Sequence, residues 1–412
     1  DGLFPIYMTK APLCKTYLRD VDKRSSCKYD YITTLTFVNF KEALFMRKKA
    51  FIASEQSYYD KLGLKKNVEP WEDALRTDGK EGSFEWWYFD AEYTNGTKVV
   101  AIFYTKKLFD ITGPANPSIS FEVTFPDGKQ IQKLTSLGAG IVIDASKEKC
   151  DLRIGDSSVK FVYGKYELHY VDHEDGVDYR CVMTPKCPMW RPGTGMHYMG
   201  EHQEHSYAWL VPLPTADVEG ELRVKGETYQ LQGSGYHDHD WGDIAMNEIF
   251  NHWYWCRASI GPYTIVTSDI IAEKAYDYSR MIHFLAVKGD KIIADDSSKV
   301  VVKRENTVIH PETGKFIDNK ISFIYTDDEQ TVTLECNREK DMFVAKLLDF
   351  VDMTPEMRAA AQQMGINPTY MRMIGTSKII VEKKNGETES YEKEALWEQM
   401  FFGGNRDAII GE

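Results

Sequence analysis

The chain has 412 residues, with 27% charged residues beside 42% hydrophobic ones and a formal net charge of −13. This acidic balance excludes a general nucleic-acid or anionic-membrane surface, because such surfaces are bound through clusters of basic residues. The length exceeds what one hydrophobic core usually spans, so we expect two domains. No apolar run approaches the roughly 20 residues of a membrane helix, and we predict no transmembrane segment. The composition is compatible with the binding of small hydrophobic ligands.

The N-terminal part differs from the rest of the chain. Apolar residues recur at helical spacing over 35–63, which predicts an amphipathic helix. We therefore assign residues 1–75 to an N-terminal helical extension. The chain begins with Asp1 rather than Met, so export or N-terminal processing stays open and no compartment is assigned. The seven cysteines show no metal-type spacing, although Cys14–Cys27 and Cys181–Cys187 could close small loops in an exported protein.

The pattern then changes to short β-rich runs divided by tight turns. The first of these runs cover 84–90, 98–104, 119–125 and 151–162. Asn-Gly, Pro-Asp-Gly and Gly-Asp turns separate them, which indicates a sandwich or barrel rather than a βαβ sheet. A stretch rich in Pro, Gly, His and Met, 184–206, is interpreted as a lid over a pocket.

One helix interrupts the later strands. Thr354 stands at the N-cap position, Pro355 occupies the first helical position, and Gly365 ends the helical pattern. We expect this short helix to be inserted in the second of two β domains, which we place at 76–232 and 233–412.

The richest cluster of functional side chains is the sequence Gly-Ser-Gly-Tyr-His-Asp-His-Asp-Trp-Gly, here called the His-Asp tract. In an extended strand His237, His239 and Trp241 share one face, while Asp238 and Asp240 share the other. Imidazole titrates near neutrality and indole can face a cation, so the histidine face suits protonation or stabilisation of a substrate. The structural alternative is that these residues are hydrogen-bonded packing groups.

An aromatic strand carries the next candidates. Alternation places Glu85 and Trp87 on one face and Trp86 on the other. A carboxylate among aromatic rings has a raised pKa unless a cation or hydrogen bonds stabilise its charge. The structural alternative is that the adjacent tryptophans plug a barrel mouth.

A second aromatic strand is expected opposite the His-Asp tract. Trp253 and Trp255 share one side with Arg257, and Tyr254 faces the other. On the following strand Asp269 lies within an apolar run. Because apolar surroundings disfavour the ionised form, Asp269 is the best candidate for a carboxylic acid that donates a proton at neutral pH. A structural aspartate accepting backbone hydrogen bonds is the alternative.

Metal and cofactor motifs are weak. Candidate ligands are His237, His239, His197, His202 and His205, but spacing does not specify a complete set. The sequence contains no Walker loop, dinucleotide fingerprint or Gly-x-Ser-x-Gly elbow. We therefore predict no metal and no cofactor.

Three motifs together resemble a known superfamily: Glu-Trp-Trp-Tyr at 85–88, Tyr-Ala-Trp at 207–209, and the His-Asp tract. The chain resembles the lipocalin-like carotenoid 1,2-hydratase (hydroxyneurosporene synthase) superfamily, with kievitone hydratase and fungal decalin-forming Diels–Alderases as relatives, over about residues 80–400. Asp240 stands where the superfamily usually has Asn. The resemblance implies two consecutive lipocalin-like β-barrel or sandwich domains, an apolar ligand cavity near their junction, and cofactor-free chemistry.

The resemblance also implies a mechanism. In the hydratase an aspartic acid protonates an isoprenoid double bond, aromatic and histidine groups shelter the carbocation, and water completes the addition. Applied to this chain, the resemblance assigns His239 and Trp241, which lie in the matching tract, to the site. It also assigns Asp269 because of its position on the following strand. A tyrosine close to that aspartate is typical of the family, and Tyr254 or Tyr263 is expected to replace it.

The sequence thus predicts an all-β fold of two lipocalin-like domains with an N-terminal helical extension. The leading functional hypothesis is a cofactor-independent hydratase that adds water to a carbon–carbon double bond of a hydrophobic isoprenoid-like molecule. A pericyclase of the Diels–Alderase type and a non-catalytic lipid carrier are the alternatives. The predicted catalytic residues are Asp269, His239, Trp241 and His237, and the predicted substrate-binding residues are Tyr236, Trp86, Glu85, Trp87, Trp253, Trp255, Tyr254 and Tyr263.

Overall fold

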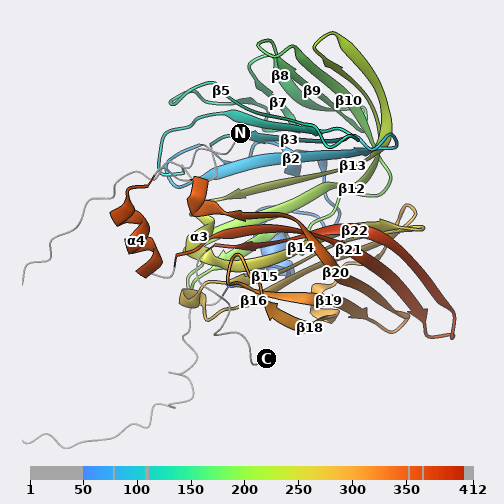
Figure 1. Cartoon of the computed structure of the whole chain (residues 1–412). Helices are drawn as coiled ribbons and strands as arrows, with labels where there is room; N and C mark the ends of the chain where they lie inside the picture. The colour runs from blue at the N-terminus through green and yellow to red at the C-terminus, as the bar shows by residue number, and fades with distance from the viewer. Residues whose placement is uncertain (1–49, 78, 107–110, 351–352, 364–365, 403–412) are drawn as a thin grey trace, which may run out of the picture.

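A computed structural model describes residues 50–77, 79–106, 111–350, 353–363 and 366–402. Within these ranges two curled antiparallel sheets pack face to face, the first drawn in blue to green and the second in yellow to red (Figure 1). Few helices accompany them, so the predicted all-β class with two lipocalin-like halves is confirmed. None of the helices in the described ranges is long and apolar enough to cross a membrane.

The first sheet has the strand order β5-β4-β3-β2-β13-β12-β10-β9-β8-β7-β6, and β1 and β11 extend it beside β12. Tight turns set this order. The Asn-Gly turn that the sequence predicted joins β2 to β3, with Gly96 at φ 88°. The strands are β1 (Ala50–Ile52), β2 (Phe84–Tyr93), β3 (Lys98–Tyr104), β4 (Ser118–Thr124), β5 (Gln130–Ser136), β6 (Asp144–Ala145), β7 (Asp151–Ile154), β8 (Ser157–Val162), β9 (Lys165–Asp172), β10 (Val177–Pro185), β11 (Met196–Met199), β12 (His205–Val224) and β13 (Glu227–Gly242).

The second sheet has the order β17-β16-β15-β14-β22-β21-β20-β19-β18. Its strands are β14 (Phe250–Ile260), β15 (Tyr263–Ala272), β16 (Arg280–Lys288), β17 (Lys291–Ala294), β18 (Val300–Ile309), β19 (Phe316–Thr326), β20 (Gln330–Lys346), β21 (Thr369–Lys383) and β22 (Thr388–Phe401). The helical elements are α2 (Gln56–Leu62), η1 (Pro70–Asp73), α3 (Met246–Ile249), η2 (Lys274–Tyr276), η3 (Ser297–Lys299), η4 (Leu347–Phe350) and α4 (Pro355–Gln363). Helix α4 begins as predicted, because the Thr354 hydroxyl accepts the Met357 N–H at 3.3 Å.

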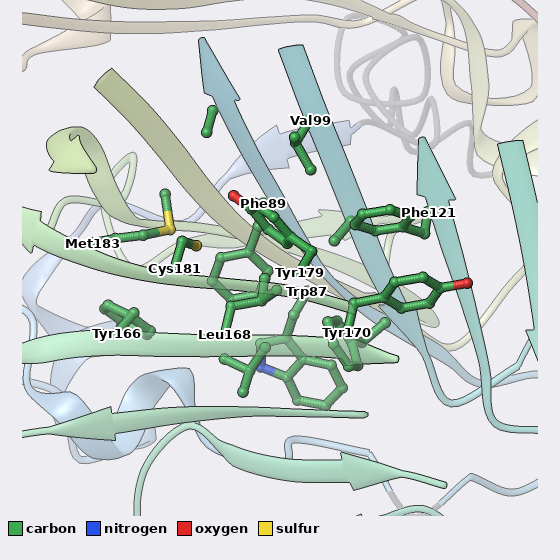
Figure 2. Packing of buried hydrophobic residues seen from close by; sticks show 14 of the residues in the cluster. Trp87, Phe89, Val99, Phe121, Tyr166, Leu168, Tyr170, Tyr179, Cys181 and Met183 are labelled. Atoms are coloured by element: carbon green, nitrogen blue, oxygen red, sulfur yellow. The ribbon is translucent and has the colours of Figure 1, made fainter. Parts of the chain in front are cut away.

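Alternation along the strands divides the buried side chains into three layers. The first half-barrel interior is aromatic, and Figure 2 shows its packing around Trp87, Phe121 and Tyr179. The second half-barrel interior contains Phe284 and Phe323. The third, which we call the inter-sheet layer, joins the two sheets and contains Tyr207, Trp209, Val211, Tyr236, Phe250, Val266, Ile270, Met281, Leu285 and Met400.

Two expectations about chain organisation are corrected. The predicted helix over 35–63 is a helix only at Gln56–Leu62, while Ala50–Ile52 forms strand β1 and 35–49 lie outside the described residues. Pairing of β1 with β11 overrides the helical spacing there. The segment 184–206 is no loose lid, because it contains β11 and its Arg191 is buried against Glu72 at 2.8 Å.

The His-Asp tract belongs to the first sheet, whereas the sequence analysis placed it at the start of the second domain. Strands β12 and β13 form a hairpin whose two turn residues, Lys225 and Gly226, have φ of 51° and 89°. Two positive φ values are typical of the tight turn that matches strand twist. The boundary predicted at residue 233 therefore lies within strand β13. The chain enters the second sheet only after Gly242. Cys181 and Cys187 are free thiols, and Cys14 and Cys27 lie outside the described residues.

One ion pair links the sheets directly. The Arg257 guanidinium of β14 donates to the Asp90 carboxylate of β2 at 2.8 Å, and the two side chains are only 17% and 11% exposed. The same guanidinium lies over the Tyr236 ring of β13, 4.8 Å from its centroid. Arg257 therefore holds the two sheets together through both a charge and a ring contact.

We predict that Arg257→Met lowers the free energy of unfolding by about 3 kcal/mol, because Asp90 then stays mostly buried without its cation. Arg223→Met is the matched control. The Arg223 side chain, which forms a salt bridge with Glu221, is 58% exposed. Loss of this salt bridge should lower the free energy of unfolding by less than about 0.5 kcal/mol. Urea unfolding followed by tryptophan fluorescence measures both, and equal losses in the two variants would contradict a structural role for the Arg257 pair.

Candidate active site between the two sheets

The predicted alternation of the His-Asp tract is confirmed. Strand β13 pairs with β2 so that His237, His239 and Trp241 lie on one face and Asp238 and Asp240 on the other. The histidine face points into the first half-barrel interior and the aspartate face into the inter-sheet layer. The tract therefore serves two separate environments.

The histidine face is a closed polar network around Asp73, the last residue of η1. The Asp73 carboxylate contacts His237 Nε2 and His239 Nδ1, each at 3.1 Å. His239 Nε2 lies 2.9 Å from Glu85 Oε1, and the Tyr166 hydroxyl donates to Asp73 at 2.6 Å. These ionisable side chains have no exposed surface.

Burial alone lowers the pKa of His239, but the Asp73 and Glu85 carboxylates outweigh it and the pKa is raised. Glu85 is further stabilised by the backbone N–H groups of Arg76 and Thr77, at 2.6 and 2.7 Å. The His237 ring stacks on Phe89 with 3.9 Å between centroids. This network is a buried core in which carboxylates and histidines compensate one another, although Asp73 Oδ1 and His239 Nδ1 form no hydrogen bond to any described residue.

Trp241 is half-buried at the end of this network. Its ring centroid lies 4.8 Å from that of His239, and the Arg76 guanidinium lies 5.8 Å from its ring. Trp87 is fully buried, stacked on His239 at 4.4 Å. Both tryptophans therefore belong to the first half-barrel rather than to the inter-sheet layer.

The expectation of a neutral, proton-donating Asp269 is wrong. Asp269 points into the second half-barrel interior, where Arg280 binds both its oxygens at 2.7 and 2.8 Å and Arg304 donates as well. Burial alone raises the pKa of this carboxyl, but the two guanidinium groups hold it well below its usual range. Asp269 is an ionised, structural carboxylate.

The two tyrosines expected near Asp269 differ in position. Tyr254 is its cross-strand partner and donates to Asp318 at 2.9 Å. Tyr263 lies at the far end of β15 and donates to Glu389 at 2.9 Å. Tyr254 thus lies beside Asp269 as expected, and Tyr263 does not.

The aspartate face of the tract contains two buried carboxyl groups whose pKa values are raised and which have no cationic partner in the described ranges. Asp238 accepts from the Tyr236 hydroxyl at 2.8 Å and from Trp209 Nε1 at 3.3 Å, while Asp240 accepts from the Tyr207 hydroxyl. They are 9% and 4% exposed, and neither forms an ion pair with a residue in the described ranges.

Burial raises the pKa of Asp238 to about 6. Burial together with the Asp238 charge raises the pKa of Asp240 well above its usual range. Two like carboxyls so close to each other cannot both ionise easily, so the pair holds a proton to a higher pH than an isolated aspartate does. We call Asp238 and Asp240 the acid pair.

Aromatic side chains from both sheets surround the acid pair. Trp86 and Tyr88 of β2 share its face, and Trp253 and Trp255 of β14 face it from the second sheet. These four side chains are half-buried, and we call them the aromatic rim. Tyr236 contacts Trp255 across the layer, with 5.6 Å between ring centroids. The predicted substrate-binding residues Tyr236, Trp86, Trp253 and Trp255 therefore meet here.

A histidine pair in the same layer joins β11 to β16. His197 Nε2 lies 2.5 Å from His283 Nε2, and His283 Nδ1 lies 2.6 Å from the Ser268 hydroxyl. Burial lowers the pKa of His197 to about 4 and that of His283 well below its usual value. Both rings are neutral at pH 7.

The hydrogen-bond acceptors around this pair determine which ring nitrogens carry a proton. His197 Nδ1 lies 3.3 Å from the Tyr207 carbonyl, which can only accept, so His197 carries its proton on Nδ1. His283 must then donate from Nε2 to His197, and its Nδ1 accepts the Ser268 O–H. The chain of hydrogen bonds runs from Ser268 to His283 to His197.

The structure thus divides the predicted site residues among three places. The first half-barrel holds His237, His239, Trp241, Glu85 and Trp87; the second holds Asp269, Tyr254 and Tyr263; the inter-sheet layer holds Tyr236, Trp86, Trp253 and Trp255. Sequence reasoning missed Asp73, Tyr207, Trp209 and the His197–His283 pair as site residues. The Tyr-Ala-Trp motif signalled Tyr207 and Trp209, but no local pattern connects His197 with His283.

One group in the described ranges has the side chains of a metal site. Ligand atoms of Asp73, Cys150 and His237 lie within 4.8 Å of one another, all buried. The Asp73 oxygen already accepts from Tyr166 and contacts His237. His197, from the predicted alternative ligand run, is instead bound to His283.

Comparisons with known proteins agree with this architecture. The model of the Diels-Alderase-like family matches residues 172–334. Hydroxyneurosporene dehydrogenase of Chlorobaculum tepidum is 26% identical over 209 residues, 43% of this chain and 53% of that protein. Quinolone epoxide rearrangement protein asqO of Emericella nidulans is 23% identical over 48% of this chain and 56% of its own length. Diels-Alderase ucsH of an Acremonium species is 24% identical, with coverages of 48% and 52%.

The chain spans about half the length of these curated relatives, whose names are those of enzymes. Among solved structures, CghA covers 82% of this chain and 96% of its own with a TM-score of 0.54 and 9% identity. An AttH-like protein of Nitrosomonas europaea has a TM-score of 0.50 and 16% identity, with coverages of 82% and 97%. The two structures show a shared fold, and the sequence relatives confirm the resemblance to the carotenoid 1,2-hydratase superfamily.

The acid pair makes the stability of the protein depend on pH. Its folded pKa values lie above those of the unfolded chain, so the folded state holds a proton that the unfolded state releases above about pH 4. The free energy of unfolding should therefore fall as pH rises from about 4 through 6 toward 8. Asp240→Asn keeps the shape but removes one titrating group, and should reduce this fall by about 1 kcal/mol or more.

Urea unfolding at about pH 5 and pH 8 measures the effect. Asp217→Asn, at a side chain 66% exposed and paired with Lys186, is the control and should leave the pH dependence unchanged. An equal pH dependence in wild type and Asp240→Asn would mean that the pair is not protonated.

Proposed function

We propose that the chain is a cofactor-independent enzyme that adds water to a carbon–carbon double bond of a hydrophobic substrate held between the two sheets. The observation that carries the proposal is the coexistence of an acid and a base in one layer. The raised pKa values of the acid pair favour its protonated form, and the His197–His283 pair stays neutral. Environments that drive pKa values apart in this way are typical of acid–base catalysis.

The acid pair supplies the proton in the first step. Asp240 is buried, and the Tyr207 hydroxyl holds one of its oxygens. Transfer of its proton to the alkene forms a carbon–hydrogen bond and leaves a carbocation on the substrate. The negative charge that remains is shared with Asp238 and stabilised by the Tyr207, Tyr236 and Trp209 donors.

The aromatic rim stabilises the carbocation. Ring faces of Trp86, Trp253 and Trp255 present negative charge density without a nucleophilic atom that could trap the cation. Tyr236 adds a further ring against Trp255. The rim is half-buried, so part of its ring surface is accessible for contact with a substrate.

The histidine pair receives the proton of the attacking water. Trp209 links the two ends of the layer, since its indole N–H binds Asp238 and its ring centroid lies 4.8 Å from that of His283. Water bound at Ser268 would add its oxygen to the cation and release a proton through Ser268 to His283. Return of that proton to Asp240 completes the cycle.

A cyclase is the second candidate, favoured by the match to the Diels-Alderase-like family and by the names of two relatives. For that reaction the neutral Asp240 would donate a hydrogen bond to a carbonyl group, and the rim would fold a polyene into its reactive shape. No proton transfer to His283 is then needed.

The test compares Asp240→Asn with Asp269→Asn on an acyclic isoprenoid polyene in oxygen-18 water. Hydration adds one labelled water to the product, cyclisation leaves the mass unchanged, and a carrier returns the polyene itself. Asp240→Asn should lower the hydration rate by about 100-fold or more, because the proton donor is lost. Per folded molecule, Asp269→Asn should lower it by less than about tenfold.

His283→Ala separates the two reactions. It should lower hydration about as strongly as Asp240→Asn and should leave a cyclisation nearly unchanged. A product without labelled oxygen, or full hydration by Asp240→Asn, would overturn the hydratase proposal.

A further inference from the structure

Arg372 has unused hydrogen-bond donors beside the aromatic rim. It lies in β21 and is half-buried. Its Nε donates to the Tyr370 hydroxyl at 2.8 Å. Throughout the described ranges this is its one hydrogen bond, and Arg372 makes no ion pair within 4.0 Å. Its two terminal nitrogens therefore have no acceptor among the described residues.

The acidic groups near Arg372 are already bound elsewhere. Glu398 is its cross-strand neighbour on β22, but Glu398 accepts from the Tyr370 hydroxyl instead. Asp90 of the first sheet is bound by Arg257 at 2.8 Å. Burial also raises the pKa of Glu398, although Arg372 opposes this shift. Glu398 thus interacts electrostatically with Arg372, but no carboxylate of the described residues lies within 4.0 Å of the guanidinium.

The position of Arg372 points it at the proposed substrate site. Electrostatic interactions connect Tyr88 of the first sheet with Arg372 and Glu398 of the second. Tyr88 is in turn the cross-strand partner of Asp238 on the same face. In the second sheet Arg372 pairs across strands with Glu398, and Glu398 pairs with Trp255 of the aromatic rim, so Arg372 lies on the rim side of that sheet.

From this geometry we propose that Arg372 binds an anionic oxygen pair, a carboxylate or an enolised dicarbonyl, at one end of the substrate. A guanidinium offers two parallel N–H donors that match such a group. The apolar, unsaturated part then lies along the rim with its double bond toward Asp240. The inference rests on the proposed function and narrows the substrate class to acid-headed hydrophobic molecules.

Two fluorescent probes test the inference: cis-parinaric acid, a conjugated polyene with a carboxylate, and its uncharged methyl ester. Titration at about pH 8 gives a dissociation constant for each from probe fluorescence. Wild type should bind the acid about tenfold or more tightly than the ester. Arg372→Met should abolish this preference while leaving ester affinity unchanged, and Arg372→Lys should retain part of it because a lysine supplies the charge without the paired donors.

Arg223→Met, which removes an exposed arginine of β12, is the control and should keep the full preference. Unchanged ester binding shows that Arg372→Met is folded. Equal binding of acid and ester to wild type, or a preference that survives in Arg372→Met, would overturn the inference and leave the proposed function standing. If neither probe binds wild type, the proposal that the inter-sheet layer binds a hydrophobic substrate is overturned, and the inference is overturned with it.

Discussion

Burial of the β2–β13 ribbon on both faces is the constraint on which the rest of the structure depends. A strand sends successive side chains to opposite sides, so over residues 84–91 and 235–242 each side chain enters either the first half-barrel or the inter-sheet layer. The ribbon carries Glu85, His237, His239, Asp238 and Asp240, and water cannot solvate any of them well. Each ionisable group must therefore find a charged partner, accept hydrogen bonds or become neutral.

The buried aspartates differ in pKa because their partners offset burial to different degrees, and for Asp90 the single Arg257 guanidinium does not fully offset it. Asp73 and Asp269 are fully buried, yet histidines or arginines keep their pKa values low. Asp238 and Asp240 are almost as buried, have only neutral donors and each other, and have raised pKa values. The same residue type thus provides structural anions in both half-barrels and carboxyls with raised pKa values between them.

The side chains that we propose for catalysis consequently lie where the two sheets meet. The half-barrel interiors hold charges that compensate one another in closed networks. The inter-sheet layer combines the acid pair, a neutral histidine pair and an arginine with unused donors, and its aromatic rim is half-buried. Residues from β2, β11, β12, β13, β14, β15, β16 and β21 contribute, so the site requires both sheets to pack in register.

The sequence by itself determined the all-β class, the hairpin turns, the start of α4, the resemblance to the superfamily and the alternation of the His-Asp tract. These depend on local propensity and on a two-residue period, which neighbouring residues reveal. Tertiary structure decided which face of the tract meets the second sheet, and for this reason the acid that we propose is the Asp238–Asp240 pair and not Asp269. The residues next to Asp269 in the sequence are indeed apolar, but the two guanidinium groups that bind its carboxylate come from β16 and β18. Charge compensation across strands sets a buried pKa, and chain order does not show which strands become neighbours.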